Sequence, residues 1–159
     1  IPFYNKEKKI HYFLARSLYG QEPKYKCAPG EKQIYNIDFI DKSKPVIFLE
    51  GPLDALFCEN SIAITGLQIG EEQERLVKDL NLYYLLDGDA PGRKKSIEFL
   101  KMGRWVFNWK KFISDNKLPE QSKYDINEVY IKMNRTEKFT FQELEKYFVN
   151  NIYHQSYFL

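Results

Sequence analysis

Short apolar runs alternate with longer polar or amphipathic segments through the middle of the chain. The runs lie at residues 46–49, 62–65, 83–86 and 105–107. Runs this short and this apolar are typical of strands that are buried on both faces, as in a parallel sheet. Helices are expected between them, beginning at Pro52 and spanning residues 70–79 and 93–102. The alternation predicts an α/β protein with right-handed βαβ units and a mainly parallel central sheet flanked by helices.

The two ends of the chain carry weaker patterns. Residues 9–14 and 33–37 predict strands, with a turn-rich stretch between them. Past Trp109, we expect short helical segments at residues 110–116, 126–133 and 140–148. The last of these opens with a capping box, in which Thr140 and Glu143 satisfy each other's backbone donors. The aromatic tail, residues 151–159, receives no assignment.

Composition excludes several classes of protein. Of the 159 residues, 43% are hydrophobic and 29% are charged, which excludes a disordered or collagen-like chain. No apolar run approaches the roughly 18 residues that cross a membrane, so no membrane association is expected. Cys27 and Cys58 cannot make a disulfide framework, so we expect a reducing, cytoplasmic location. Because the chain begins with Ile1 instead of Met, we interpret it as a fragment or a processed product.

Acidic residues follow two of the predicted strands directly. Glu50 ends the first apolar run and Asp87 the third, and ligands of open α/β sheets lie beyond such carboxyl ends. Asp89 follows two residues after Asp87, and Asp54 lies one helical turn after Glu50. Carboxylates gathered in one place repel each other unless a cation is shared among them. Oxygen ligands of this kind suit Mg²⁺ or Mn²⁺.

Each of these acids also has an ordinary structural interpretation. Glu50 could cap the next helix, Asp87-Gly88-Asp89 could be a simple turn, and Asp54 could be a solvated helix residue. The joint pattern favours a shared site. The formal net charge of +2 does not by itself indicate nucleic-acid binding, but it is compatible with an acidic site surrounded by basic residues.

Two segments around these acids resemble the signatures of the TOPRIM domain. The sequence EGPLDAL at residues 50–56 is similar to the EGxxD signature, and DGDAPGR at residues 87–93 is similar to DxDxxGR. TOPRIM domains occur in DnaG-type primases, type IA and type II topoisomerases, RecR-like proteins, OLD-family nucleases and a ribosomal RNA maturase. This combination is most similar to the primases. The resemblance implies a three-layer, Rossmann-like fold.

Flanking segments extend the resemblance toward primases. Residues 15–18 resemble a GRxL segment, residues 22–26 a PKY segment, and residues 124–128 the DxNE segment of phage primase-helicases. The chain departs from bacterial primases at Tyr35-Asn36, where they usually have Phe-Lys, and in a longer loop after Trp109. The implied organisation is a short β-containing N-terminal arm (1–44), a TOPRIM catalytic core (45–135) and a C-terminal helix with its tail (136–159).

The resemblance implies metal-dependent phosphoryl transfer in a primase that makes RNA primers on single-stranded DNA. The implied catalytic residues are Glu50, Asp87 and Asp89, and Asp54 and Asp125 are expected to join them as ligands of Mg²⁺ or Mn²⁺. The expected nucleotide and phosphate contacts are Arg16, Lys24, Arg93 and Lys94, with Tyr25 as a base-stacking residue. The expected partners are the template, nucleoside triphosphates and a replicative helicase or helicase domain.

Two other functions remain open at this point. The same signatures would suit a TOPRIM nuclease or a topoisomerase fragment, although the twelve tyrosines do not nominate a nucleophile. The chain could also be a non-catalytic nucleotide-binding or DNA-binding module of a larger replication protein. In that interpretation, an isolated core binds nucleotides but lacks turnover.

Overall fold

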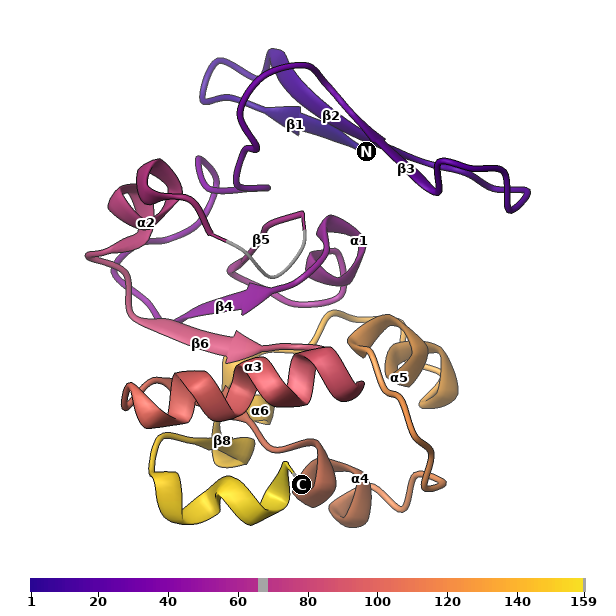
Figure 1. Ribbon diagram of the computed structural model, residues 1–159, viewed down its shortest axis with the longest axis vertical. Coiled ribbons are helices and arrows are strands. Elements are labelled where there is room, and N and C mark those ends of the chain that lie inside the picture. Colours follow the sequence, from indigo (N-terminus) through magenta and orange to yellow (C-terminus); the bar gives the residue numbers. More distant parts are fainter. Residues whose placement is uncertain (66–68, 159) are drawn as a thin grey trace.

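A five-stranded sheet in the order β5-β4-β6-β7-β8 forms the centre of the molecule (Figure 1). The computed structural model describes residues 1–65 and 69–158. The strands are β4 (Val46–Leu49), β5 (Ser61–Ala63), β6 (Leu82–Leu85), β7 (Trp105–Phe107) and β8 (Phe148–Val149). The first four pair in parallel, whereas β8 joins β7 antiparallel. The predicted α/β class with a mainly parallel sheet is therefore confirmed.

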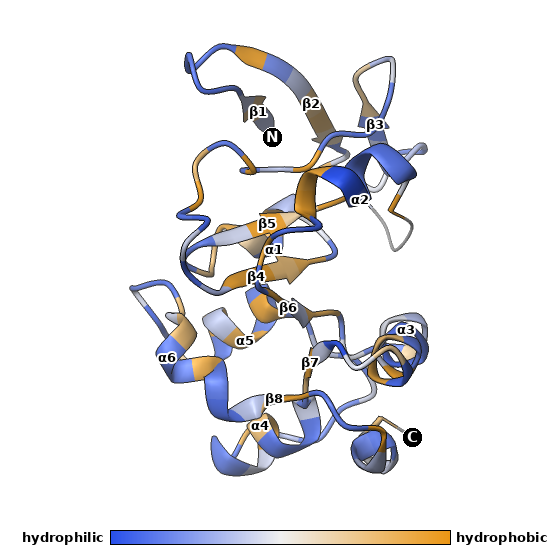
Figure 2. Cartoon of the chain, turned by 90° about the vertical axis from the view of Figure 1, so that its left-hand side faces the viewer, coloured by the Kyte–Doolittle hydropathy of each residue, from blue (hydrophilic) through white to orange (hydrophobic). Residues whose placement is uncertain are grey.

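Helices cover both faces of this sheet and complete three layers. They are α1 (Pro52–Ala55), α2 (Glu71–Val77), α3 (Ala90–Lys101), α4 (Trp109–Asp115), α5 (Ile126–Lys132) and α6 (Phe141–Leu144). Alternate strand residues point to opposite faces. Ile47 and Leu49 therefore pack with α4, α5 and α6, while Val46 and Phe48 pack with α2 and α3. The strands are accordingly largely orange in the hydropathy colouring, and the helices alternate orange with blue (Figure 2).

The N-terminal arm is a separate antiparallel sheet of three strands, β1 (Pro2–Tyr4), β2 (Ile10–Arg16) and β3 (Tyr25–Cys27). Its inner face buries a small core of Phe3, Tyr12 and Leu14. The Tyr35 ring lies edge-on to Phe3, with ring centroids 5.2 Å apart, and connects this core to the segment that leads into β4. The arm lies at the top of Figure 1, beyond α1 and β5. The prediction of a β-containing arm is confirmed.

Two local predictions were wrong. Residues 33–37 form no strand, because Asn36 adopts a left-handed backbone (φ 65°) and leaves only an isolated antiparallel bridge between Tyr35 and Ala63. The helix expected to reach residue 148 ends early, as α6 passes through a 3₁₀ turn, η1 (Glu145–Tyr147), into β8. Pairing of Phe148 with Phe107 overrides local helix propensity there. The unassigned tail forms a 3₁₀ helix, η2 (Ile152–Tyr157).

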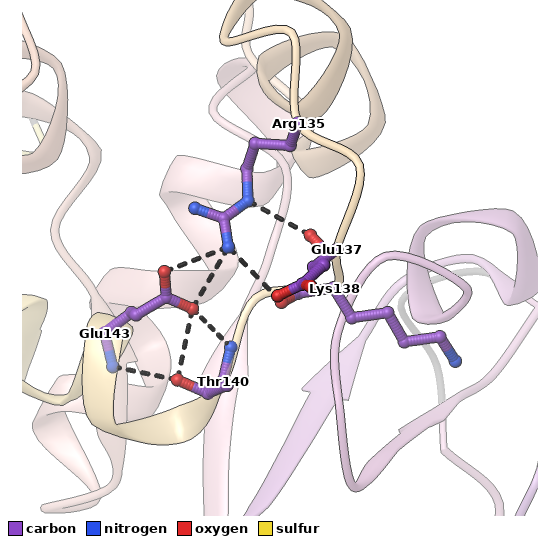
Figure 3. Close-up of polar contacts among 5 residues, drawn as sticks. All are labelled: Arg135, Glu137, Lys138, Thr140 and Glu143. Atoms are coloured by element: carbon purple, nitrogen blue, oxygen red, sulfur yellow. Dashed lines mark hydrogen bonds and ion pairs between the residues drawn. The ribbon is translucent and has the colours of Figure 1, made fainter.

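Arg135 holds the connection between α5 and α6 together (Figure 3). Its guanidinium donates to both carboxylate oxygens of Glu143, at 2.9 and 3.1 Å, and to the carbonyls of Glu137 and Lys138. It also lies 4.1 Å from the centroid of the Phe139 ring. The predicted capping box is present, since Glu143 and Thr140 bond each other's backbone N–H groups. The planar guanidinium therefore orders the whole turn.

Replacing Arg135 with Ala is expected to lower the free energy of unfolding by about 1–2 kcal/mol, because several carbonyl and carboxylate acceptors lose their donor. Arg135→Lys should recover only part of this, because an ammonium lacks the Nε donor to Glu137 and the planar face that lies over Phe139. Thermal unfolding of both variants, with exposed Lys78→Ala as control, measures the effect. An Arg135→Ala variant as stable as the control would contradict the assignment.

None of the helices in the described parts of the chain is long and apolar enough to span a membrane. The proposed boundaries near residues 44 and 135 remain predictions. The C-terminal segment nevertheless contributes β8 to the central sheet, so it is built onto the same core as the parallel strands.

Candidate active site

Parallel pairing places Glu50 and Asp87 at the same edge of the sheet. Leu49 at the end of β4 pairs with Leu85 at the end of β6, so the residues that follow both strands emerge together. The backbone N–H of Asp87 donates a hydrogen bond of 2.9 Å to Glu50 Oε1. The N-cap of α1 is Gly51, so Glu50 does not cap that helix. Its carboxylate is instead bound across the sheet edge.

Glycines allow the backbone to approach these carboxylates closely. A Cβ atom on Gly92 would overlap the Asp87 carbonyl oxygen and would lie 2.9 Å from Glu50 Oε1. A Cβ atom on Gly51 would lie 2.8 Å from Asp54 Oδ2. Gly92 is thus required by close approach to backbone, whereas a side chain at residue 51 would displace the Asp54 carboxylate; neither glycine has a positive φ.

Asp89 and Asp125 each cap a helix. Asp89 accepts a hydrogen bond of 3.0 Å from the N–H of Gly92 and begins α3, which starts three residues earlier than the sequence indicated. Asp125 accepts one of 2.7 Å from the N–H of Glu128 and begins α5. Each bond uses only Oδ1, and an ionised carboxylate has a second acceptor oxygen. Capping therefore fixes both side chains at the acidic edge while leaving each a further oxygen for a ligand.

The carboxylates influence one another's protonation. Burial, strengthened by the charge of Asp87, raises the pKa of Glu50 to about 7. Burial and the charges of Asp87 and Asp125 raise the pKa of Asp54 to about 7. Burial and the charges of Asp125 and Asp89 raise the pKa of Asp87 to about 6. The five acids thus form one electrostatic cluster, which a cation would stabilise.

The donor set of this cluster suits a hydrated divalent ion. All its side chains offer oxygen, the ligand preferred by Mg²⁺ and Mn²⁺. Within residues 1–65 and 69–158, no three Asp, Glu, His or Cys side chains are already drawn together as a closed ligand set. Mg²⁺ in particular keeps several waters and binds through one or two carboxylates plus substrate phosphates. The residues therefore fit an ion shared with a phosphate-bearing ligand, and not a preformed all-protein cage.

The raised pKa values make the metal-free protein's stability depend on pH. Between about pH 4 and 7 the folded state keeps protons that the unfolded chain releases, so these acids lower stability as pH rises and the effect levels off above pH 7. Asp54→Asn should therefore raise the free energy of unfolding at pH 8 by about 1–2 kcal/mol and should flatten the pH dependence.

Thermal unfolding at pH 5 to 8 in a chelating buffer checks this expectation, with exposed Asp79→Asn as the control. Other acids, such as Asp41 with its lowered pKa, contribute the opposite slope. The difference between each variant and the parent is therefore the quantity to compare. Parallel pH curves for the Asp54→Asn variant and the parent would contradict the mutual repulsion.

The turn between the acids is bonded to the segment that carries Asp125. The N–H of Gly88 donates to the Tyr124 carbonyl at 2.6 Å. Arg93 Nη1 donates to the carbonyls of Gly88, at 2.5 Å, and Ser122, at 3.2 Å. Arg93, expected from the sequence to contact phosphate, is thus placed on two backbone carbonyls, and a phosphate contact remains a prediction.

Aromatic packing supports the same junction, and the sequence alone did not reveal it. Trp109 stacks on Tyr124, with ring centroids 5.9 Å apart, and its Nε1–H donates to the Leu86 carbonyl at 2.7 Å. The Tyr124 hydroxyl donates to the Pro119 carbonyl. Trp109 could have been nominated only from its place after the fourth strand, because its partners are distant in sequence.

The basic candidates of the arm gather around Tyr25. Arg16 and Lys24 each lie 5.6 Å from the centroid of its half-exposed ring. The positive charge of Arg16 also acts on Asp54, where it opposes the rise in pKa. Arg16 therefore lies within electrostatic reach of the acidic cluster. Lys94 is exposed in the first turns of α3.

Comparison with known proteins bears on this arrangement. No protein-family model matches the chain. The DNA primase of Enterobacteria phage T4 is 35% identical over 159 residues, which cover 96% of this chain and 42% of that protein. The chain is homologous to part of this DNA primase. A DNA primase from Staphylococcus aureus is 28% identical over 127 residues, which cover 67% of this chain and 21% of that protein.

Solved primase structures share the fold. The Escherichia coli primase catalytic core superposes with a TM-score of 0.62 at 18% identity, covering 92% of this chain and 51% of that one. The zinc-binding and RNA polymerase domains of the Aquifex aeolicus primase give 0.60 at 22%, covering 83% and 36%. A DnaG primase catalytic domain bound to single-stranded DNA gives 0.56 at 19%, covering 83% and 47%. The chain spans less than half the length of the phage T4 primase.

Proposed function

We propose that this chain is the catalytic TOPRIM part of a DNA primase, which joins nucleoside triphosphates into RNA primers on single-stranded DNA. The observation that carries this proposal is the acidic edge, where Glu50 accepts the Asp87 N–H and Asp54, Asp89 and Asp125 lie within electrostatic reach. The homology to a DNA primase supports this activity over the others found with the fold.

The carboxylates would hold Mg²⁺ or Mn²⁺, with Glu50, Asp87 and Asp89 as the main ligands and Asp54 and Asp125 assisting. When bound, such ions neutralise triphosphate charge and help to ionise the attacking hydroxyl. The protein's own contribution is to position the reactants. Both the N–H and the carbonyl of Gly88 are hydrogen-bonded, which fixes the turn between Asp87 and Asp89. The acids therefore need little rearrangement when the ligand binds.

Basic and aromatic side chains around the acids would orient the nucleotide and the template. Arg16, Lys24 and Lys94 would contact phosphates, and Tyr25, with two cations beside its ring, would stack on a base. One solved relative was captured with single-stranded DNA, which supports the template assignment. We further propose cytoplasmic action with a replicative helicase or helicase domain, and the division into arm, core and C-terminal segment at residues 44 and 135.

Two incubations test the proposal against a nuclease of the same fold. With template, nucleoside triphosphates and Mn²⁺, a primase forms template-dependent RNA. With labelled single-stranded DNA, Mn²⁺ and no nucleotides, a nuclease cleaves the strand. Primer formation that disappears in Glu50→Gln supports the proposal, because the amide cannot supply the ionised oxygen. Cleavage that disappears in that variant would favour the nuclease instead.

A further inference from the structure

A groove of about 940 Å³ opens beside the acidic turn. It begins at Gly88, the residue between Asp87 and Asp89, and follows α4 and the loop before Asp125. Ser156 and Phe158 at the end of the chain complete its wall. Its volume lies near the upper end of the range for pockets that hold drug-sized ligands, so it can accommodate at least one nucleotide unit. The groove and the acidic cluster thus share the Gly88 turn as a common border.

The groove is lined by more positive than negative charge. Its basic residues are Arg93, Lys110, Lys111 and Lys117, and its acidic residue is Glu120. Lys111 is paired with Asp115 at 2.7 Å, so its charge is partly neutralised within α4. Arg93 bonds to two backbone carbonyls, and these bonds do not neutralise its charge because carbonyls are neutral. Lys110 and Lys117 are exposed at the two ends of α4. The lining therefore favours an anionic ligand.

Besides charged and polar residues, the lining has an apolar and aromatic part. Trp109 and Tyr124, stacked on each other, form part of the wall together with Ile113, Leu118 and Phe158. Free phosphate or a small carboxylate has no apolar group that could pack against such a surface. A nucleic-acid strand has both kinds of group, because its backbone carries charge while its sugars and bases offer apolar faces.

A second hollow provides a contrast. It measures about 330 Å³ and lies around Phe139, Arg135 and Glu143. Arg135 Nη2 donates to both carboxylate oxygens of Glu143, so the charge of this arginine is neutralised by an acid. The acidic turn contributes no residue to it. The larger groove, in contrast, begins at Gly88 in the acidic turn. A strand whose end lies at Asp87 and Asp89 could therefore continue directly into it.

We propose that this groove binds the phosphodiester backbone of single-stranded DNA. The strand runs from the acidic cluster over Gly88 and along α4, with its phosphates near Lys110 and Lys117 and its sugars and bases toward Trp109. The identification of the ligand as DNA rests on the proposed function. The existence of an anion-binding groove rests on the lining alone.

Binding of a fluorescent oligothymidine of about 16 nucleotides, in EDTA and low salt, tests the groove without using the metal site. Lys110→Glu/Lys117→Glu should weaken binding roughly tenfold or more and should reduce the salt dependence, since phosphate contacts are lost. The control is Lys42→Glu/Lys78→Glu, which makes the same change in net charge at exposed sites outside the groove. The control should stay within about twofold of the parent. All four lysines are exposed, so thermal midpoints should be unchanged.

The outcomes separate the groove from the proposed function. An equal loss of DNA affinity in both double variants, or no loss of DNA affinity in the groove variant, would overturn the proposal that the groove binds DNA. So would a groove variant that loses Mn²⁺-dependent nucleotide binding while its DNA affinity is unchanged, because the groove would then serve the triphosphate. If only the groove variant loses DNA while Asp87→Asn keeps full nucleotide binding, the groove stands and the proposed function fails.

Discussion

Asp87→Asn is expected to reduce Mn²⁺-dependent nucleoside triphosphate binding by roughly 100-fold and to abolish primer synthesis. The substitution preserves shape, so it isolates the loss of one negative charge and one ligand oxygen. The hydrogen bond to Glu50 should survive, because its donor is the backbone N–H of residue 87. Removing a charge from a mutually repelling set should also leave the metal-free fold at least as stable.

Calorimetric titration of Mn²⁺ and nucleotide into the Asp87→Asn variant measures the effect. Asp79→Asn is the matched control, since Asp79 is exposed just after α2 and lies outside the acidic cluster. A thermal unfolding curve confirms that both variants fold. Unchanged metal and nucleotide binding in a folded Asp87→Asn variant would show that the acidic edge is not the metal and nucleotide site.

Gly92→Ala is expected to be strongly destabilising, although helix propensity alone predicts the opposite. Gly92 lies in the first turn of α3, where alanine would normally gain up to about 1 kcal/mol. The added Cβ would, however, overlap the Asp87 carbonyl oxygen, which belongs to backbone and cannot rotate away. We expect a loss of about 2–4 kcal/mol, together with weakened Mn²⁺ binding as the turn is pushed from Glu50.

Gly70→Ala provides the control for Gly92→Ala. Among residues 1–65 and 69–158, the atom nearest to its Cβ would be the Gln73 side-chain oxygen at 3.9 Å, so only a modest capping cost below about 1 kcal/mol is expected. Thermal unfolding and calorimetric titration of Mn²⁺ are measured for both variants. The difference between them separates the effect of steric overlap at residue 92 from the general effect of replacing a glycine. A Gly92→Ala variant that melts at or above the parent's midpoint would show that the close packing is not needed.

The sequence could predict the strands and the meeting of two acids because those features are local or follow from parallel topology. Four apolar runs are buried between helix layers, and Glu50 and Asp87 directly follow two adjacent parallel strands. Pairing with β7 could not be read from residues 148 and 149, because the capping box before them favours helix. The partners of Arg93 were likewise hidden, since Ser122 is 29 positions away.

The groove shows the same limit at larger scale. Its wall draws on the acidic turn, α3, α4, the following loop and the last residues of the chain. No window of sequence contains that set. The basic residues of α4 belong to no signature in the sequence, and only their position in the groove that begins at Gly88 gives them a candidate role.

The bonds that join Gly88 to Tyr124 and Arg93 to Ser122 have a consequence for how such a protein can diverge. They fasten the chain immediately before Asp125, while α4 fixes it up to Asp115. Insertions or deletions between those two anchors that keep the contact of Pro119 with the Tyr124 hydroxyl can therefore be absorbed without displacing Asp125. The length of this loop can therefore change during evolution without changing the positions of the carboxylates. The wall of the groove can then be reshaped while the acidic edge stays the same.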